Sequence, residues 1–155
     1  MASKSSPAPA VAFRPMQRMD LQRVLAIERS SFRSPWPRSA FELAIAAPDL
    51  LSVVACADDV LGYLIGCPDA NDLLIANVAV RPRARRNGVG RRLVDQAICR
   101  ARELHLVSCK LDVRMSNEDA QRLYDRMGFE PHSVRRGYYQ HPAEDALHMR
   151  LALDH

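Results

Sequence analysis

The sequence predicts an α/β fold of the α+β kind, with one mixed, mostly antiparallel sheet of about seven strands and four helices. Three observations predict it. A buried strand, an arginine-rich glycine turn and an amphipathic helix follow one another within residues 73–104. Short runs rich in β-branched residues, separated by polar turns, lie on both sides of that segment. The chain has 155 residues, which suits a single domain with a sizeable core.

The strand and the helix of this segment are both recognised by their apolar positions. Residues Leu73 to Val80 are apolar apart from Asn77 and predict a buried strand. The helix after the turn has apolar residues at the 3.6-residue period of one buried face. These residues are Val89, Leu93, Val94, Ala97, Ile98, Ala101 and Leu104. The turn therefore lies between a buried strand and a helix N-terminus.

The turn has the properties of an anion site. First-turn N–H groups of a helix have no intrahelical partner, and the helix dipole adds partial positive charge there. Gly88 and Gly90 carry no side chain, so a phosphate can approach the backbone closely. A P-loop is excluded because two arginines follow the second glycine, and a dinucleotide fingerprint is excluded because position 93 is Leu. What remains is Arg85-x-x-Gly88-x-Gly90, and the alternative is an ordinary glycine turn beside a solvated basic patch.

The other elements follow from the same periodicities. Predicted strands cover 11–16, 51–57, 60–67, 73–80, 107–114, 129–139 and 146–153, and predicted helices cover 20–32, 39–47, 89–104 and 118–127. Asp58-Asp59 joins two strands as a hairpin. The strand at 107–114 is expected to run parallel to the strand at 73–80 through a right-handed crossover.

Caps and turns are predicted from polar residues and prolines. Asp20 and Asn117 are candidate helix N-caps. A turn is expected at Pro68 to Asp72, and a loop is expected around Gln140 to Asp145.

The composition is that of a globular, mildly basic chain. The formal charge is +4, and Lys4 and Lys110 are the only lysines among 22 basic residues, so 20 are Arg. Such a chain fits a polyanionic cofactor, an acidic peptide or nucleic acid, and a solvated basic surface is the alternative. Residues 1–10 are rich in Ser, Pro and Ala and are expected to be a disordered tail, so the domain is expected to cover 11–155.

Cysteine, histidine and hydropathy patterns point to no metal, membrane or secretory feature. The four cysteines have no zinc spacing and lie in apolar contexts, which predicts small core residues of a reducing compartment. His105, His132, His141 and His148 show no metal spacing and are expected to be surface or strand residues. No apolar run is long enough to span a membrane, and no secretory signal is recognised. We therefore expect a cytoplasmic protein.

Three stretches resemble known acetyltransferases. Arg85-x-x-Gly88-x-Gly90 resembles the acyl-CoA pyrophosphate motif of the GNAT N-acetyltransferase superfamily, and the order of predicted elements is the GNAT order. Residues 27–41 and 111–153 look like the bacterial RimI-type ribosomal-protein-alanine N-acetyltransferases. They also resemble archaeal and eukaryotic protein N-terminal acetyltransferases. The resemblance extends over nearly the whole predicted domain.

The resemblance implies direct transfer of acetyl from acetyl-CoA to the α-amine of a protein N-terminal residue in a ternary complex. A ribosomal-protein alanine is one candidate acceptor, and a GNAT enzyme for a small amine or a lysine side chain is the alternative. A third hypothesis is a basic module that binds RNA or the ribosome. The arginines and aromatic residues of Arg135-Arg136-Gly137-Tyr138-Tyr139 are its only indication in the sequence. The favoured hypothesis, N-terminal acetyl transfer, requires no metal, no membrane and no direct nucleic-acid contact, and a monomer is expected.

The resemblance also implies which residues bind the cofactor. Backbone groups of Val78, Ala79 and Val80 would hold the pantetheine arm and the thioester. The pyrophosphate would lie against the turn that comprises Arg85, Arg86, Asn87, Gly88, Val89, Gly90 and Arg91. Asn117 matches a position that contacts the cofactor, and this role is compatible with N-capping.

Two residues match the catalytic pair of the family. Tyr124 matches the tyrosine that acts as general acid toward the CoA sulfur, and the alternative is a core tyrosine. Asp112 stands where the RimI pattern has Glu as general base, and Asp is one methylene shorter. Asp112 could act through a longer water bridge, be replaced by another base, or simply face solvent.

Two aromatic segments are expected to flank the acceptor. In the relatives the N-terminal residue of the substrate lies between the segment Ser34, Pro35 and Trp36 and the pair Tyr138 and Tyr139. The alternatives are a packed tryptophan and two strand tyrosines. The loop after Tyr139 is shorter than in the bacterial pattern, so the substrate sequence is left open.

Overall fold

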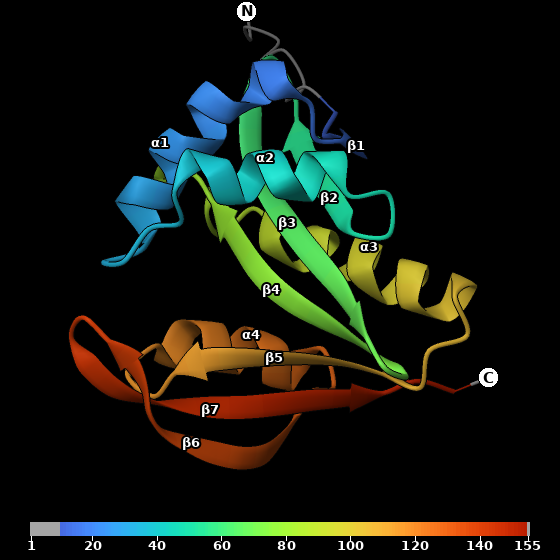
Figure 1. The fold of residues 1–155 in the computed structure, drawn as a ribbon, viewed down its shortest axis with the longest axis vertical. Coiled ribbons are helices and arrows are strands. Elements are labelled where there is room, and N and C mark those ends of the chain that lie inside the picture. The colour runs from blue at the N-terminus through green and yellow to red at the C-terminus, as the bar shows by residue number, and fades with distance from the viewer. Residues whose placement is uncertain (1–9, 155) are drawn as a thin grey trace, which may run out of the picture.

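The computed structural model describes residues 10–154, which form seven strands and four α-helices (Figure 1). The strands are β1 (Ala12–Pro15), β2 (Leu51–Cys56), β3 (Val60–Asp69), β4 (Asp72–Val80), β5 (Ser108–Arg114), β6 (Glu130–Gln140) and β7 (Ala143–Ala152). The helices are α1 (Leu21–Ser31), α2 (Arg38–Ala46), α3 (Val89–Glu103) and α4 (Glu118–Arg126), and single 3-10 turns occupy Arg18–Asp20 and Pro82–Ala84. The predicted element order is confirmed. The tail predicted to be disordered lies outside the described residues except for Ala10.

All seven strands form one sheet in the order β1-β2-β3-β4-β5-β7-β6. The only parallel neighbours in this described sheet are β4 and β5, which α3 connects, and every other neighbouring pair is antiparallel. The mixed, mostly antiparallel sheet is therefore confirmed, as is the predicted parallel pairing on either side of a helix.

The parallel strands β4 and β5 pair over a short length and then separate. Asp72–Leu74 lie opposite Ser108–Lys110, and Figure 1 shows the two strands diverging from this junction. Polar contacts hold the junction together, because Lys110 Nζ lies 2.7 Å from an oxygen of Asp69 and the Ser108 hydroxyl donates to Asp72. The sheet thus opens into a V with its apex at this junction.

A bulge in β4 contributes to the opening. Ile65 of β3 pairs with Asn77 whereas the next residue, Gly66, pairs with Ile75, so Ala76 is an extra residue in β4. A bulge bends a strand and increases its twist. Beyond it, residues 78–80 pair with β3 and not with β5. The β5-facing side of this backbone therefore lines the gap.

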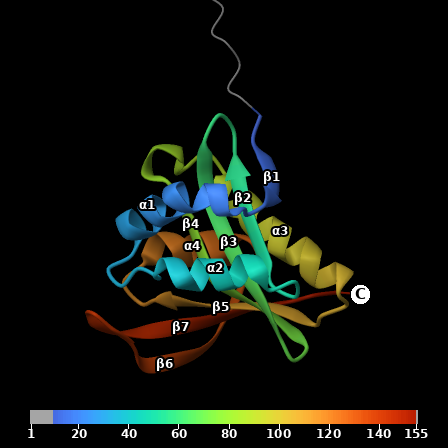
Figure 2. The same ribbon diagram turned by 45° about the horizontal axis from the view of Figure 1, so that its top comes forward.

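Two apolar cores cover the two faces of the sheet. Helices α1 and α2 pack on one face of the β2–β4 part around Phe41 and Tyr63, and α3 lies on the other face (Figure 2). Leu64, Leu93 and Phe129 belong to the core that α3 and α4 cover. Tyr63 and Leu64 are adjacent in β3 and enter different cores, as the alternation of a strand requires. Burial of each such side chain stabilises the fold by about 1.5–3 kcal/mol.

Two predicted turns are shorter in the structure than the sequence indicated. Strand β3 continues through Pro68 to Asp69, so the turn before β4 consists of Ala70 and Asn71. The predicted loop at 140–145 is reduced to His141 and Pro142 between β6 and β7. In both places pairing across an antiparallel ladder outweighs the local preference of proline and acidic residues for turns.

Asp20 does not cap α1 as predicted. Its carboxylate accepts the Gln17 N–H at 2.8 Å and contacts two nitrogens of Arg14 at 2.8 Å each. These charge-assisted bonds are stronger than a single cap bond, and Arg14 lowers the pKa of the Asp20 carboxyl. Asp20 therefore ties β1 to the start of α1, which has no side-chain N-cap.

The prediction of four core cysteines is correct for one of them. Cys109 is buried, Cys56 and Cys67 are half-buried, and Cys99 is exposed. Cys99 lies on α3 between residues of the buried stripe and points away from the core, because apolar neighbours in sequence do not share a helix face.

Gly62 should resist substitution because β3 and β4 approach closely there. A Cβ atom at Gly62 would lie 2.7 Å from the carbonyl oxygen of Ala79 and 3.1 Å from Leu93 Cδ1. We expect Gly62→Ala to lower the free energy of unfolding by about 1–3 kcal/mol, the usual cost of overpacking. Gly66→Ala is the matched control, since its Cβ would meet nothing nearer than 3.5 Å. Urea unfolding followed by circular dichroism checks this, and equal midpoints for the two variants would contradict it.

Candidate active site

Two adjoining pockets occupy the gap between β4 and β5. The first, here called the turn pocket, has a volume of about 760 Å³ and lies between the end of β4, the turn before α3 and helix α4. The second, the loop pocket, has a volume of about 680 Å³ and lies between the α1–α2 loop, β5 and the β6–β7 turn. Both are lined by Ser31, Phe32, Val78, Asn117, Ala120 and Tyr124. A molecule in one pocket can therefore meet a molecule in the other at these residues.

The glycine turn forms the floor of the turn pocket. Gly88 adopts a left-handed φ of 77° immediately before α3, a conformation that glycine reaches without strain. The first intrahelical bond runs from the Arg92 N–H to the Gly88 carbonyl, so the earlier N–H groups of the helix are left for an anion. The strand–turn–helix predicted from the sequence is confirmed as a local structure.

Arginines surround the turn pocket. Arg85 braces the turn, because its Nε donates to the Val80 carbonyl at 3.0 Å and its terminal nitrogen lies 3.2 Å from the Ser31 hydroxyl. The arginines that line the pocket are Arg85, Arg86, Arg91, Arg122 and Arg126. The last two lie on α4, and sequence reasoning did not find them. Five guanidinium groups around a helix N-terminus make this pocket suited to a phosphate-bearing ligand.

The remaining predicted cofactor residues divide into two groups. Val78, Ala79, Val80, Gly90 and Asn117 line the turn pocket, whereas Asn87 and Val89 are not among its lining residues. Val89 is buried in the core beneath α3. Asn117 caps α4, because its Oδ1 accepts the Ala120 N–H at 3.2 Å, so the predicted N-cap is confirmed.

Tyr124 lies where the two pockets meet. It projects from α4 and is 8% exposed, with its ring 5.7 Å from the ring of Phe129. Burial, followed by the neighbouring Tyr139, raises its pKa to about 12. The phenol is therefore protonated at neutral pH and can donate a proton or a hydrogen bond to a group placed between the pockets.

Asp112 lies in the loop pocket and is held by two partners. Its Oδ1 lies 2.8 Å from Nδ1 of His148 and 3.1 Å from Nε of Arg135. The expectation that Asp112 might merely face solvent is not supported, since its side chain is 11% exposed. His148 was expected to be a surface or strand residue; it is in strand β7 but is buried. The contact between Asp112 and His148 could not be predicted from local sequence, because it depends on the register of the β5–β7 ladder, in which the two residues are direct partners.

Glu28 is a buried carboxylate that the sequence analysis did not single out. It is 1% exposed and lines the loop pocket. Its oxygens accept from the Tyr63 hydroxyl at 2.5 Å, the Asn77 side-chain amide at 2.9 Å and the Trp36 N–H at 2.9 Å. Burial and the Glu28 charge raise the pKa of Tyr63. The signal in the sequence was a glutamate four residues after Val24, on the apolar face of α1.

The two expected aromatic segments contribute some of their residues to the loop pocket. Ser34, Trp36 and Tyr139 line it, and the Ser34 hydroxyl lies 3.3 Å from the His141 carbonyl, which links the α1–α2 loop to the β6–β7 turn. Pro35 and Tyr138 are not among the lining residues. Tyr138 is half exposed and packs against the edge of Tyr139 at a centroid distance of 5.0 Å.

Tyr139 is fixed by the groups around it. The guanidinium of Arg114 lies 4.2 Å above its ring, and the same guanidinium lies 3.2 Å from an oxygen of Glu144. Burial and the charge of Asp112 raise the pKa of Tyr139 to about 12. Hydrogen bonding from Ser116, followed by Arg114, lowers the pKa of Glu144. This wall of the pocket therefore has a defined shape and charge.

Comparison with known proteins identifies the family. Residues 21–129 match the acetyltransferase (GNAT) family. The chain belongs to this family. A candidate ribosomal protein bS18-alanine N-acetyltransferase of Bacillus subtilis is 32% identical over 92% of this chain and 96% of its own length. The N-alpha-acetyltransferase RimI of Mycobacterium tuberculosis is 32% identical over 87% of this chain and 88% of its own.

The fold comparison agrees with the family. The crystal structure of the ribosomal-protein-S18-alanine N-acetyltransferase from Escherichia coli superimposes with a TM-score of 0.85 at 26% identity, covering 94% of this chain and 96% of that one. The predicted GNAT fold is confirmed, and the chain is an acetyl-CoA-dependent N-acetyltransferase of this family. The exclusion of a P-loop and of a dinucleotide fingerprint is consistent with this result.

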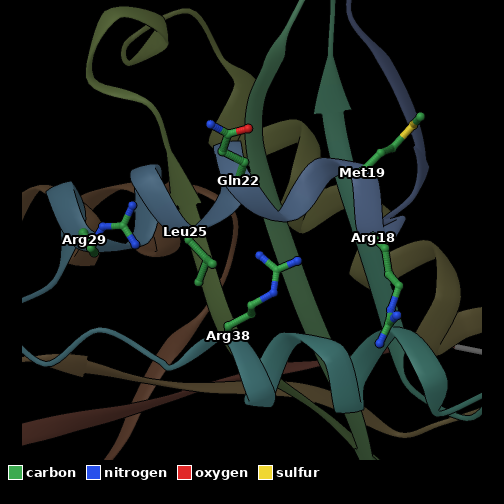
Figure 3. A pocket seen from close by; sticks show the side chains of 6 residues that line it. All are labelled: Arg18, Met19, Gln22, Leu25, Arg29 and Arg38. Carbon is green, nitrogen blue, oxygen red and sulfur yellow. The ribbon is translucent and has the colours of Figure 1, made fainter.

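Other features of the GNAT domain lie apart from the two pockets. A hollow of about 500 Å³ between α1 and α2 is lined by Arg18, Met19, Gln22, Leu25, Arg29 and Arg38 (Figure 3). Two of these arginines pair with Glu42, which leaves a mixed, largely solvated face. Within residues 10–154, no group of three or more His, Cys, Asp or Glu side chains is arranged to hold a metal ion. No helix in the same part of the chain is long and apolar enough to cross a membrane.

Neighbouring arginines on α3 offer a test of the turn pocket. Arg91 lines it, whereas Arg92 stacks on Phe13 at 4.8 Å and lies 3.4 Å from the Val11 carbonyl. A charge-assisted hydrogen bond to phosphate is worth about 1.5–3 kcal/mol, so we expect Arg91→Ala to weaken acetyl-CoA binding roughly 10-fold or more. Arg92→Ala should leave this affinity unchanged. Isothermal titration calorimetry measures the acetyl-CoA affinity of both variants. Equal losses of affinity would contradict binding of the acetyl-CoA pyrophosphate in the turn pocket.

Proposed function

We propose that this chain is a protein N-terminal acetyltransferase of the RimI type, which transfers acetyl from acetyl-CoA directly to the α-amine of a protein's first residue. The observation that carries the proposal is the meeting of the turn pocket and the loop pocket at Val78 and Tyr124. Donor and acceptor can thereby be bound together in a ternary complex. The names of the relatives make the alanine of a ribosomal protein the first acceptor to test. We further infer a cytoplasmic monomer that acts without a membrane or nucleic-acid partner.

Acetyl-CoA would occupy the turn pocket. Its pyrophosphate would lie against Gly88 to Arg91, where unpaired N–H groups, the helix dipole and the surrounding arginines favour negative charge. Its pantetheine arm would run beside residues 78–80, whose β5-facing side has no strand partner. The amide groups of the arm can take the place of that missing strand. The thioester would then lie near Tyr124.

The acceptor N-terminus would enter through the loop pocket. The carboxylates of Glu28 and Asp112 both line it, which favours an ammonium group at its inner end. Trp36 and Tyr139 both line the pocket and would contribute apolar surface around the first side chain. Glu28 also holds the α1–α2 loop through the Trp36 N–H, so it shapes the wall that it charges.

The proposed reaction needs one base and one acid. The α-ammonium group, whose pKa is about 8, loses a proton to Asp112 through a bridging water. The free amine attacks the thioester carbonyl, a C–N bond forms, and the C–S bond breaks. Tyr124, which is protonated at neutral pH, donates a proton to the departing sulfur. The nitrogen gives up its remaining extra proton through water, Tyr124 regains a proton from water, and Asp112 releases its proton to solvent. The products are the acetylated N-terminus and CoA.

A peptide panel tests the proposed acceptor. We expect acetyl transfer to peptides with a free N-terminus, best with a small first residue such as alanine, and initial-rate plots that intersect, as a ternary complex requires. Nα-blocked lysine peptides and small amines serve as controls. Mass spectrometry locates the acetyl group. Transfer confined to lysine or small amines would reject this substrate class, and salt-sensitive RNA binding without CoA affinity would favour a binding module.

Tyr124→Phe tests the proposed acid. General acid catalysis contributes about 10²- to 10⁴-fold, so kcat should fall within this range while acetyl-CoA affinity stays unchanged. Because the pKa of Tyr124 is about 12, the wild-type kcat should not decline through loss of this proton below about pH 10. Stopped assays from pH 6 to pH 10 provide the profile. A Tyr124→Phe variant with wild-type kcat would exclude the role.

A further inference from the structure

We infer that His148 is a positioning residue for Asp112. His148 and Arg135 together fix the orientation of the Asp112 carboxylate. This carboxylate, which is one methylene shorter than the glutamate of the RimI pattern, can then serve the acceptor amine. The inference rests on the proposed function and concerns the same site. His148 belongs to neither pocket lining, so its role would be exerted through Asp112.

The backbone places the three side chains together. Asp112 and His148 are direct partners in the antiparallel β5–β7 ladder, so their side chains project from the same face of the sheet. Arg135 reaches the pair from β6, with its Nε 3.1 Å from Asp112 Oδ1 and a terminal nitrogen 3.5 Å from His148 Nδ1. Three adjacent strands therefore each supply one member of the cluster.

Both contacts are made to the same carboxylate oxygen. His148 Nδ1 lies 2.8 Å from Asp112 Oδ1, and Arg135 Nε also approaches Oδ1. The second oxygen, Oδ2, takes part in neither contact. With one oxygen fixed, the carboxylate cannot rotate freely about its bond to Cβ. Oδ2 is then held for the water that would bridge to the amine, which a longer side chain could approach more directly.

The proton on the imidazole follows from its neighbour. A carboxylate only accepts, so Nδ1 of His148 carries hydrogen and Nε2 is free when the ring is neutral. The charged and titratable groups around the pair are Arg135, the ring of His132 at 5.8 Å, and Tyr139, whose pKa the Asp112 charge raises. In the reaction the amine proton reaches Oδ2 through water, while the hydrogen on Nδ1 stays in place. His148 thus orients the base without itself accepting the proton.

A double-mutant cycle tests the inference. His148→Leu removes the donor, and we expect kcat to fall by about 10- to 100-fold, the cost of misplacing a reacting group, while the KM for acetyl-CoA is unchanged. His148→Asn keeps a side-chain N–H in place of Nδ1 and should recover most of the activity. In an Asp112→Asn background, His148→Leu should change kcat/KM by less than about 2-fold, because the two residues act as one unit. His132→Leu, which alters the exposed neighbouring ring, is the matched control and should leave kcat unchanged.

Each other outcome contradicts the inference. The effects of Asp112→Asn and His148→Leu on kcat/KM could be independent and multiply, or His148→Asn could fail to restore activity. Either result would show that His148 has only a structural role. The cycle is run with whichever amine the chain acetylates, so failure of the peptide panel rejects the proposed substrate and leaves this test intact. Nitrogen-15 NMR of the imidazoles adds a readout that needs neither activity nor a variant. It should show hydrogen on Nδ1 of His148, and a neutral ring with hydrogen only on Nε2 would overturn the inference.

Discussion

The candidate active site of this domain originates in the separation of β4 from β5. Parallel pairing is limited to 72–74 and 108–110, and a bulge at Ala76 then turns β4 away. Backbone polar groups need partners, so a sheet that opens must offer its unpaired edge to something other than a strand. An extended, amide-containing cofactor arm is suited to this edge. The site thus arises from an interruption of the sheet rather than from a loop added to it.

The elements on the two sides of the gap give the two pockets different charges. The N-terminus of α3 and the arginines of α4 supply positive charge in the turn pocket, whereas Glu28 and Asp112 supply negative charge in the loop pocket. The loop pocket also contains Arg33 and Arg114, so its carboxylates are partly balanced, whereas the turn pocket is predominantly cationic. This difference fits the donor and acceptor sites that we propose. Tyr124 lies between them, and its burial keeps it protonated. The charges of the two pockets therefore favour the two-substrate arrangement that we propose.

Two buried carboxylates connect the elements around the loop pocket. Glu28 accepts three hydrogen bonds from three different segments of the chain, and Asp112 contacts two strands. Charged groups with so little exposure are stable only with such partners. Each carboxylate therefore both charges the pocket and fixes the wall to which it is bonded. The hydrogen bonds and ion pairs of Glu28 and Asp112 offset the cost of burying their carboxylates inside a small domain.

Features that depend on neighbours along the chain could be predicted without the structure. The strand–turn–helix around Gly88, the cap at Asn117, the order of elements and the position of Tyr124 on α4 all follow from local periodicity, backbone freedom and motif spacing. Three facts emerged only from the fold: Glu28 is buried and accepts the Trp36 N–H, His148 contacts Asp112, and Tyr138 lies outside the loop pocket. These facts depend on strand register and on the opening of the sheet. Both are set by contacts between residues far apart in sequence, which no local pattern records.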